Sequence, residues 1–234
     1  MAEAALETVP QEIVRHASVR NQAQRLGLKP SETLLDRSYH HAAMMKLDDA
    51  NKRGRPDIVH FALMEALGTP LFMKGMLRVY VHTIKDKLVA IADNLRVPKS
   101  YFRFEGLMVN LFRDMVVKTE EGAVLMELSD GTLAHLISSI KPDKVVGLST
   151  MGVKNTVEKA VAQNLTDDCA FVIGGFPKGH FSESTMKLLN RTYSISDSRL
   201  EAHVVIARLL YECEKLLEKG VHHEGDEKRR QVGA

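Results

Sequence analysis

From about residue 120 onward, short and nearly continuous apolar segments alternate with helical patterns, and this alternation restricts the fold more than any other feature of the chain. The apolar segments are AVLMEL (123–128), KVVGLS (144–149), CAFVIGG (169–175) and TYSIS (192–196). The helical patterns are TLAHLISSI (132–140), TVEKAVAQNL (156–165), SESTMKLLN (182–190) and RLEAHVVIARLLYECEKLLEKG (199–220). Strands covered by helices on both faces are apolar throughout, so the order predicts an α/β fold with a parallel sheet flanked by helices.

The first half of the chain predicts a helix, a hairpin and a second helix. Pro56 suits the first position of a helix, and Asp57 suits its first turn. Two β-rich segments, LRVYVHTI (77–84) and KLVAIA (87–92), then flank a polar turn and predict a β-hairpin. The pattern PKSYFRFEGLMVNLFRDMVV (98–117) predicts a helix that begins at its proline.

Two regions show no clear period. Residues 20–55 are rich in charge and histidine, and we expect them to be loop-like. Residues 220–234 carry charges of both signs and almost no apolar side chains, which predicts a disordered tail.

Composition restricts the cellular setting more than the function. The net charge of +2 and the pI of about 8.5 are too small to indicate nucleic-acid binding by themselves. Cys169 and Cys213 are too few for a disulfide framework, which favours a reducing compartment. No apolar run approaches the roughly 18–20 residues of a membrane span, and MAEAALETVP lacks the features of an export signal. We therefore expect an intracellular protein with no membrane segment.

Parallel sheets bind ligands in the loops that follow the carboxyl ends of their strands. This rule directs attention to GLSTMG (147–152), IGGFPKGHFSES (173–184) and SISDSRL (194–200). The glycine-rich loop lacks the Lys-Ser/Thr of a Walker A motif and the glycine spacing of a dinucleotide fingerprint. A tight strand-to-helix turn with Ser182 as the helix cap explains it equally well.

Other catalytic patterns are absent from the sequence. There is no Gly-x-Ser-x-Gly elbow, and neither cysteine has an activating neighbour. His40 and His41 are adjacent, so their side chains point apart, and no partners follow at metal-ligand spacing. We expect no metal site.

Basic residues gather at two helix starts. Lys52, Arg53 and Arg55 immediately precede the helix that carries Asp57. In RVPKSYFRF, Arg96 precedes the predicted helix, whereas Lys99 and Arg103 are expected four apart on one helical face. Such a triplet grips a phosphate backbone in some proteins, but from spacing alone a solvated helix end is the favoured interpretation.

Several motifs resemble the nucleolar essential protein family, a group of SPOUT-class methyltransferases. They are LLDRSYHHAAMMKL, KRGRPDIVHFALMEALGTPL, LRVYVHTIKDKLV, RVPKSYFRFEGLMVNLF, VIGGFPKGHFSE and YSISDSRLEAHVVIARLLYE. The resemblance covers about residues 30–219, and the compact middle is more similar to archaeal than to eukaryotic members. The family methylates N1 of a pseudouridine in small-subunit ribosomal RNA.

The resemblance implies a SPOUT-type sheet with a deep C-terminal trefoil knot, an exception to the rule against threaded chains, plus a hairpin and helix extension. It implies a single methyltransferase domain over residues 1–219, followed by the tail. Within that domain it implies an RNA-binding part at 30–118 and a knotted part at 120–219. S-adenosylmethionine is the implied cofactor, and a cytoplasmic homodimer is the implied state.

The resemblance also implies site residues. Cofactor contacts fall, largely through backbone groups, on Leu148, Gly174, Gly179, Ile195, Ser196, Asp197, Ser198, Arg199 and Leu200. RNA contacts fall on Arg55, Arg96, Lys99 and Arg103. Asp57 is expected to hold Arg55 in place. The hypothesis is that Arg55 grips the extruded base or its phosphate, while Asp57 orients Arg55 and assists deprotonation.

Two departures from the family pattern stand out. Eukaryotic members often have Asn-Tyr-Pro-Leu where this chain has DSRL (197–200), and only AALETV (4–9) is present to form the opening strand. Two other functions stay open: a SPOUT methyltransferase that acts on transfer RNA, and a ribosome-assembly factor whose main work is RNA binding.

Overall fold

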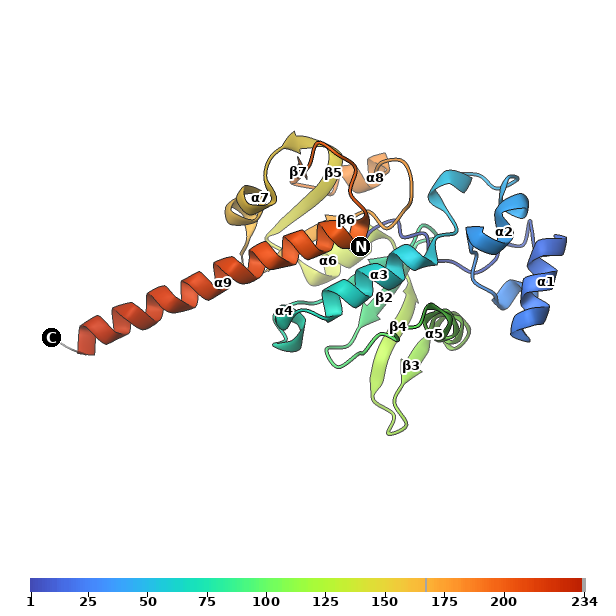
Figure 1. The fold of residues 1–234 in the computed structure, drawn as a ribbon, viewed down its shortest axis with the longest axis horizontal. Coiled ribbons are helices and arrows are strands. Elements are labelled where there is room, and N and C mark those ends of the chain that lie inside the picture. The colour runs from blue at the N-terminus through green and yellow to red at the C-terminus, as the bar shows by residue number, and fades with distance from the viewer. Residues whose placement is uncertain (167, 233–234) are drawn as a thin grey trace.

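The computed structural model describes the chain except residues 167 and 233–234, and it describes side chains up to residue 218. Two separate sheets organise the described chain (Figure 1). One is antiparallel with strand order β1-β2-β4-β3, and the other is parallel with order β6-β5-β7. The strands are β1 (Tyr80–His82), β2 (Lys87–Ile91), β3 (Val116–Lys118), β4 (Val124–Asp130), β5 (Lys144–Lys154), β6 (Cys169–Ile173) and β7 (Arg191–Ser194).

The parallel sheet confirms the expected α/β class, with one correction. The segment 123–128 was expected in this sheet, but β4 instead pairs antiparallel with both β2 and β3. Its buried residues, Met126 and Leu128, alternate with exposed ones. That alternation is typical of an antiparallel strand with one wet face. The sequence does not indicate this alternation, because apolar Val124 lies at an exposed position of the strand and makes the segment read as apolar throughout.

The helices mostly match expectation, but residues 20–55 do not. The helices are α1 (Ala17–Leu26), α2 (Arg37–Met44), α3 (Pro56–Leu67), α4 (Pro70–Met73), α5 (Tyr101–Asp114), α6 (Leu133–Ile140), α7 (Val157–Asn164), α8 (Glu183–Met186) and α9 (Ala202–Val232), with short 3-10 turns η1 (Pro30–Glu32) and η2 (Ala50–Lys52). The expected loop therefore contains helices. His16 and Asp36 cap α1 and α2, and each helix is short and mostly polar, with only a few buried side chains to indicate it in the sequence.

The hairpin is confirmed, since β1 and β2 are adjacent and antiparallel. The basic helix begins later than predicted. α5 starts at Tyr101 with Ser100 as its cap, so Lys99 lies in the loop before the helix and does not share a helical face with Arg103. Proline at 98 fits the bend that precedes the helix instead of its first turn. The backbone of α9 continues to Val232, so it includes residues 220–232 of the segment for which a disordered tail was predicted, whereas residues 233–234 lie outside the described part of the chain.

The amino-terminal segment runs between the two sheets (Figure 1). Ala2 forms a parallel bridge to Gly174 after β6, and Ala4 forms one to Thr83 after β1. The Ala2 amide donates to the carbonyl of Ile173 at 2.9 Å, and the Ala4 amide donates to that of His82 at 2.9 Å. The segment 4–9 therefore makes isolated bridges, not a regular strand, yet it fastens the sheets to each other.

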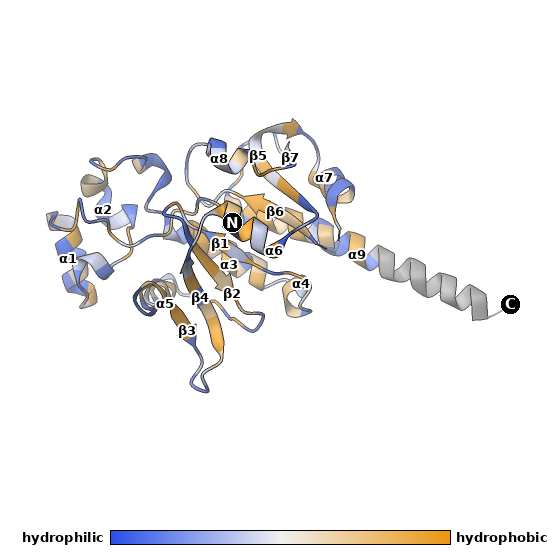
Figure 2. Cartoon of the chain, turned by 180° about the vertical axis from the view of Figure 1, so that it is seen from behind, coloured by the Kyte–Doolittle hydropathy of each residue, from blue (hydrophilic) through white to orange (hydrophobic). Residues whose placement is uncertain are grey.

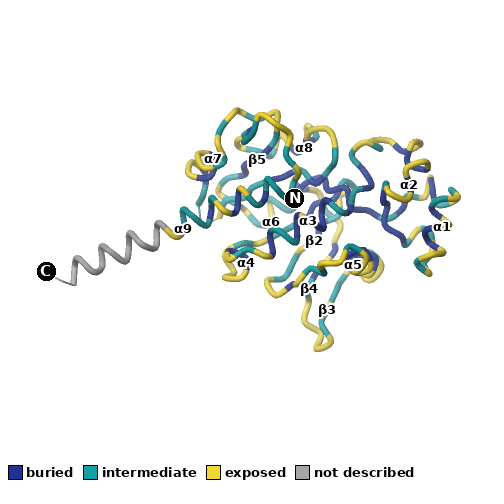
Figure 3. Tube along the Cα trace, viewed as in Figure 1, coloured by how far each residue is buried: buried dark blue, intermediate teal, exposed yellow. Residues whose placement is uncertain are grey.

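A single apolar core continues from one sheet to the other. It joins side chains from α3 and α5 with side chains from β4, β5 and α9, including Val59, Phe104, Met126, Leu148 and Leu209. Hydrophobic residues concentrate on the strands in Figure 2, and Figure 3 shows that α7 alternates between exposed and buried residues, as a helix with one face on the core does. α3 packs along α9, so the helix that begins beside Arg55 is held by the carboxyl-terminal half of the chain.

A buried ion pair secures the segment that precedes α3. Both nitrogens of the Arg53 fork donate to Glu7, Nε to Oε1 at 2.8 Å and Nη2 to Oε2 at 2.7 Å. Each side chain is only 5% exposed. The hydrogen bonds to Glu7 raise the pKa of Arg53. Removing one partner of such a pair leaves an uncompensated charge in the interior.

We therefore predict that Arg53→Met lowers the free energy of unfolding by about 3 kcal/mol. For a chain of this length the midpoint of thermal unfolding should fall by about 6–12 °C. Lys87→Met is the matched control, because it breaks the exposed Lys87–Asp130 pair and should cost about 1 kcal/mol or less. Calorimetry that found equal losses for both variants would contradict a structural role for Arg53.

Candidate functional site

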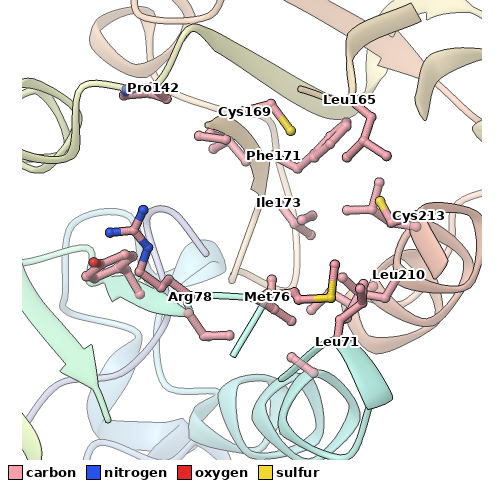
Figure 4. A pocket seen from close by; sticks show the side chains of 18 of the residues that line it. Leu71, Met76, Arg78, Pro142, Leu165, Cys169, Phe171, Ile173, Leu210 and Cys213 are labelled. Carbon is pink, nitrogen blue, oxygen red and sulfur yellow. The ribbon is translucent and has the colours of Figure 1, made fainter. Parts of the chain in front are cut away.

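The larger of two hollows is apolar and contains none of the predicted site residues. This cavity of about 690 Å³ lies between the sheets, and Figure 4 shows the side chains around it. Leu71 and Met76 border it on one side, Phe171 and Ile173 of β6 on another, and Leu210 and Cys213 of α9 on a third. Burial raises the pKa of the Cys213 thiol to about 12, so this cysteine is an inert core residue.

A second hollow, of about 130 Å³, lies at the carboxyl ends of the parallel strands. All but one of the residues predicted to contact a cofactor line it: Leu148, Gly174, Gly179, Ile195, Ser196, Ser198, Arg199 and Leu200. The exception is Asp197, which accepts a hydrogen bond from Lys154 Nζ at 2.6 Å in a pair that is 83% exposed on both sides. The hydrogen bond from Lys154, and then the charge of Lys154, lower the pKa of Asp197.

The strand geometry explains why the hollow is there. β5 pairs regularly with β6 as far as Leu148, which lies opposite Ile173. Its pairing with β7 then shifts in register between Leu148 and Val153. The intervening residues leave the ladder, and two of them, Ser149 and Thr150, border the hollow. A bulge at the ends of parallel strands opens the space that a covered sheet otherwise closes.

The glycine-rich loop after β6 forms one wall of the hollow. Gly179 has φ +97°, a left-handed conformation that side chains other than glycine rarely adopt. The loop ends at Ser182, whose side-chain oxygen accepts from the Thr185 amide at 3.2 Å and caps α8. The expected strand-to-helix turn is therefore present, and it borders the hollow as well.

Arg55 and Asp57 form a bidentate pair at the start of α3. Arg55 Nε donates to Asp57 Oδ1, and Nη2 donates to Oδ2, both at 2.7 Å. This hydrogen bonding raises the pKa of Arg55, and the charge of Glu201, which lines the hollow, adds to the effect. The arginine side chain is 37% exposed, so the pair fixes its direction without covering it.

The basic triplet lies at the start of α5. Arg96, Lys99 and Arg103 are all exposed, and within the described residues none of them takes part in an ion pair. The loop before the helix is tied to α3, because the buried ring of His60 contacts the Pro98 carbonyl through Nε2 at 2.7 Å. The same ring stacks on Phe104, with 4.5 Å between centroids.

Tyr101 ties the first turn of α5 to α2. Its hydroxyl donates to Asp36 Oδ2 at 2.5 Å, and Asp36 Oδ1 also caps α2 by accepting from the Ser38 amide at 2.8 Å. Burial, and then the bond to Asp36, raise the pKa of Tyr101. Contacts with α2 and α3 therefore fix the segment that carries the triplet.

Sequence reasoning missed several residues of the hollow. The additional lining includes Ile58, Phe176, Phe181, Ala202 and Val205. The two phenylalanines flank the glycines inside the motif already chosen, so their apolar character was an available signal. Ile58 carried no such signal, because only tertiary packing brings the start of α3 to the hollow. α3 therefore connects the hollow, through Ile58, with the Arg55–Asp57 pair and, through His60, with the loop that carries the basic triplet.

Two kinds of feature are missing from the part of the chain that the structure describes. No cluster of three or more His, Cys, Asp or Glu side chains suits a metal ion. Among the same residues, no helix combines the length and the apolar character needed to cross a bilayer.

Comparison with known proteins identifies relatives over almost the whole chain. Residues 1–214 match the family model described as EMG1/NEP1 methyltransferase. The ribosomal RNA small subunit methyltransferase Nep1 of Staphylothermus marinus is 37% identical, covering 92% of this chain and 94% of the relative. The protein of that name from Saccharolobus solfataricus is 38% identical, covering 93% and 96%. The crystal structure of Archaeoglobus fulgidus Nep1 bound to S-adenosylhomocysteine is similar with a TM-score of 0.82 at 33% identity, covering 93% of this chain and 97% of the other.

The Tyr101–Asp36 contact leads to a prediction about stability. Tyr101→Phe removes a hydrogen bond to the carboxylate of buried Asp36 and should lower the free energy of unfolding by about 2 kcal/mol. Tyr211→Phe is the matched control, since Tyr211 is 60% exposed, and it should change stability by about 0.5 kcal/mol or less. Denaturant unfolding that gave the same midpoint for both variants would show that the hydroxyl does not hold α5 to α2.

Proposed function

Because the chain belongs to the EMG1/NEP1 methyltransferase family, we propose that it transfers a methyl group from S-adenosylmethionine to N1 of a pseudouridine in small-subunit ribosomal RNA. The observation that carries this proposal is that Ile58, the residue after Asp57 on α3, lines the hollow at the strand ends, as does Glu201, whose charge acts on Arg55. A methyl donor in that hollow and a base gripped by Arg55 would face each other across the start of α3.

The hollow suits S-adenosylmethionine in its chemistry. Leu148, Ile195 and Leu200 give it apolar sides that fit the face of a purine ring, and the loops supply backbone donors and acceptors for the edges of that ring. Gly179, with φ +97°, allows the turn by which the loop borders the hollow. When bound, S-adenosylmethionine supplies an electrophilic methyl carbon attached to its sulfonium.

Methyl transfer makes its main demand on the nucleophile. The N1–H of pseudouridine is imide-like, so its proton must leave before or during attack, and negative charge develops on the ring. A guanidinium held beside the base stabilises that charge and orients the base for in-line displacement. Both carboxylate oxygens of Asp57 accept from Arg55, so the first task of Asp57 is to fix this guanidinium.

Replacing Arg55 tests its role in the chemical step. Arg55→Ala should lower kcat/KM for methylation at least about 100-fold, as loss of a donor to developing charge does in other enzymes. Affinity for S-adenosylhomocysteine should stay within about twofold, because the hollow itself is unchanged.

Arg113→Ala is the matched control, since it removes the exposed Arg113–Asp114 pair, which has the same bidentate geometry. It should leave both quantities unchanged. Rapid methylation by Arg55→Ala would remove Arg55 from the mechanism, and equal loss of methylation and cofactor affinity would indicate misfolding.

The exposed triplet is proposed to grip the RNA backbone. Each of Arg96→Gln, Lys99→Gln and Arg103→Gln should lower the slope of log K against log salt by about 0.7–0.9, the effect of one phosphate contact. Lys159→Gln removes an exposed lysine from α7, a helix in the part of the chain that contains the parallel sheet, and should leave the slope unchanged. Filter binding at several salt concentrations measures these slopes. Unchanged slopes for all three variants would place the RNA elsewhere.

The substrate base is tested with matched RNA hairpins that carry pseudouridine or uridine at one loop position. The proposal expects label from S-adenosylmethionine on the first hairpin alone, at N1 by mass spectrometry. Transfer to both hairpins, or to a transfer RNA instead, would favour another SPOUT activity. Binding without transfer would favour an assembly factor, the other alternative.

The proposal includes finer features that the family suggests. The part of the chain over residues 120–219 forms a deep trefoil knot, and the enzyme works as a homodimer in the cytoplasm. The similarity to the Archaeoglobus fulgidus structure supports the fold on which the knot depends. Sedimentation of the purified protein tests the dimer directly.

A further inference from the structure

Lys52 connects the glycine-rich loop with the segment that carries Arg55. Its Nζ donates to Glu3 Oε2 at 2.9 Å and also to the backbone carbonyl of His180. The same ammonium lies 4.7 Å from the centre of the Phe176 ring. Only 21% of the lysine side chain is exposed. A lysine that needed only to be solvated would not adopt this position, because its side-chain entropy favours the open surface.

Glu3 extends this connection to the far end of the loop. Its second oxygen, Oε1, accepts from both the amide and the hydroxyl of Ser182 at 2.7 Å. Burial alone raises the pKa of Glu3, but the bonds from Ser182 and Lys52 outweigh burial and leave that pKa lowered. Glu3 has φ +51°, a costly backbone conformation for this residue type. The carboxylate is therefore charged and held in place by the loop and by Lys52.

The stem of Lys52 also lies against the middle of the loop. A Cβ added to Gly179 would come within 3.1 Å of Lys52 Cε. Lys52 and Glu3 thus touch the loop at Phe176, Gly179, His180 and Ser182, and all of these except Ser182 line the hollow.

The path from Lys52 to Arg55 is short and anchored at each step. Arg53 is fixed by the buried pair with Glu7, and the Arg55 amide donates to the Ala5 carbonyl at 3.2 Å. The segment of residues 3–7 therefore holds Lys52, the Arg55 backbone and Arg53 in turn. Displacing the loop would disturb Lys52 and, through this clamp, the guanidinium that faces the base.

We propose that Lys52 is a positioning residue that couples the cofactor loop to Arg55, so that cofactor and RNA strengthen each other's binding. The inference rests on the proposed function of the site and goes beyond it, since Lys52 touches neither reacting atom. A coupling between two ligands is reciprocal, so each raises the affinity of the other by the same factor. A factor of about 5–10 lies within the range that such couplings span.

The test compares Lys52→Met with Lys52→Arg in the full chain. Met keeps the stem and loses the donor, whereas Arg keeps a cation that can reach Glu3. Calorimetry measures S-adenosylhomocysteine affinity with and without a saturating pseudouridine hairpin. For Lys52→Met we expect affinity about tenfold weaker and no enhancement by RNA, with a raised KM for S-adenosylmethionine and little change in kcat. Lys52→Arg should restore part of the coupling.

Two further variants complete the experiment. Lys154→Met is the matched control, because it breaks the exposed pair with Asp197 at the rim of the same site, and it should preserve the coupling. Glu3→Gln provides a second route if Lys52→Met unfolds, and it should weaken the coupling with a smaller loss of stability.

The outcomes separate the inference from the function on which it rests. Full coupling in folded Lys52→Met, or equal effects of Lys52→Met and Lys154→Met, would overturn the role of Lys52 while methylation by the native chain stands. Absence of coupling in a native chain that methylates RNA would do the same. Failure of the native chain to bind S-adenosylhomocysteine would overturn the proposed function and the inference with it.

Discussion

The site depends on the buried amino-terminal segment that fastens the two sheets together. Its backbone bridges Gly174 beyond β6 and Thr83 beyond β1, so it sets the spacing between the loops at those strand ends. Its carboxylates then hold the segment that leads into α3. Without this connection the parallel sheet would still form a hollow, but the segment that leads into Arg55 would be held relative to it only through the packing of α3 on α9.

The division of labour between the sheets follows from their connectivity. Parallel strands leave their carboxyl ends at one edge, and loops from β5, β6 and β7 meet there to enclose a small space with many backbone groups. The antiparallel sheet instead supports α5, which carries exposed Arg103 in its first turn and follows the loop with exposed Arg96 and Lys99. α3 belongs to both parts, since Ile58 borders the hollow and His60 holds the loop before α5. A helix shared in this way can hold a methyl donor in the hollow and a phosphate backbone beside α5 at a defined separation.

The sequence predicts the parallel sheet, the hairpin and most of the hollow, because each depends on local apolar patterns or on residues close together in a motif. It fails where tertiary contacts decide. The start of α5 moves to Tyr101 because Asp36 and α3 hold the loop before it. Strand β4 belongs to the antiparallel sheet, although its apolar sequence is typical of a strand buried in a parallel sheet. Asp197 faces solvent, where it pairs with Lys154, which is far away in sequence. The contacts of Lys52 and Glu3 with the glycine-rich loop could not be predicted either, because they also join residues that are far apart in sequence.

The cluster of cations before α3 looks like an anion-binding surface in the sequence, yet the chain supplies a carboxylate for each of them. Glu3 accepts from Lys52, Glu7 from Arg53 and Asp57 from Arg55. Of the three, Arg55 keeps the most exposed side chain, so one guanidinium remains available to a ligand while the other two cations serve the architecture. The exposed triplet at α5 has no such partners among the described residues. Adjacent basic residues therefore differ in function according to the acid that pairs with them, and the exposed triplet, which has no acidic partner among the described residues, is the proposed site of attraction to the RNA backbone.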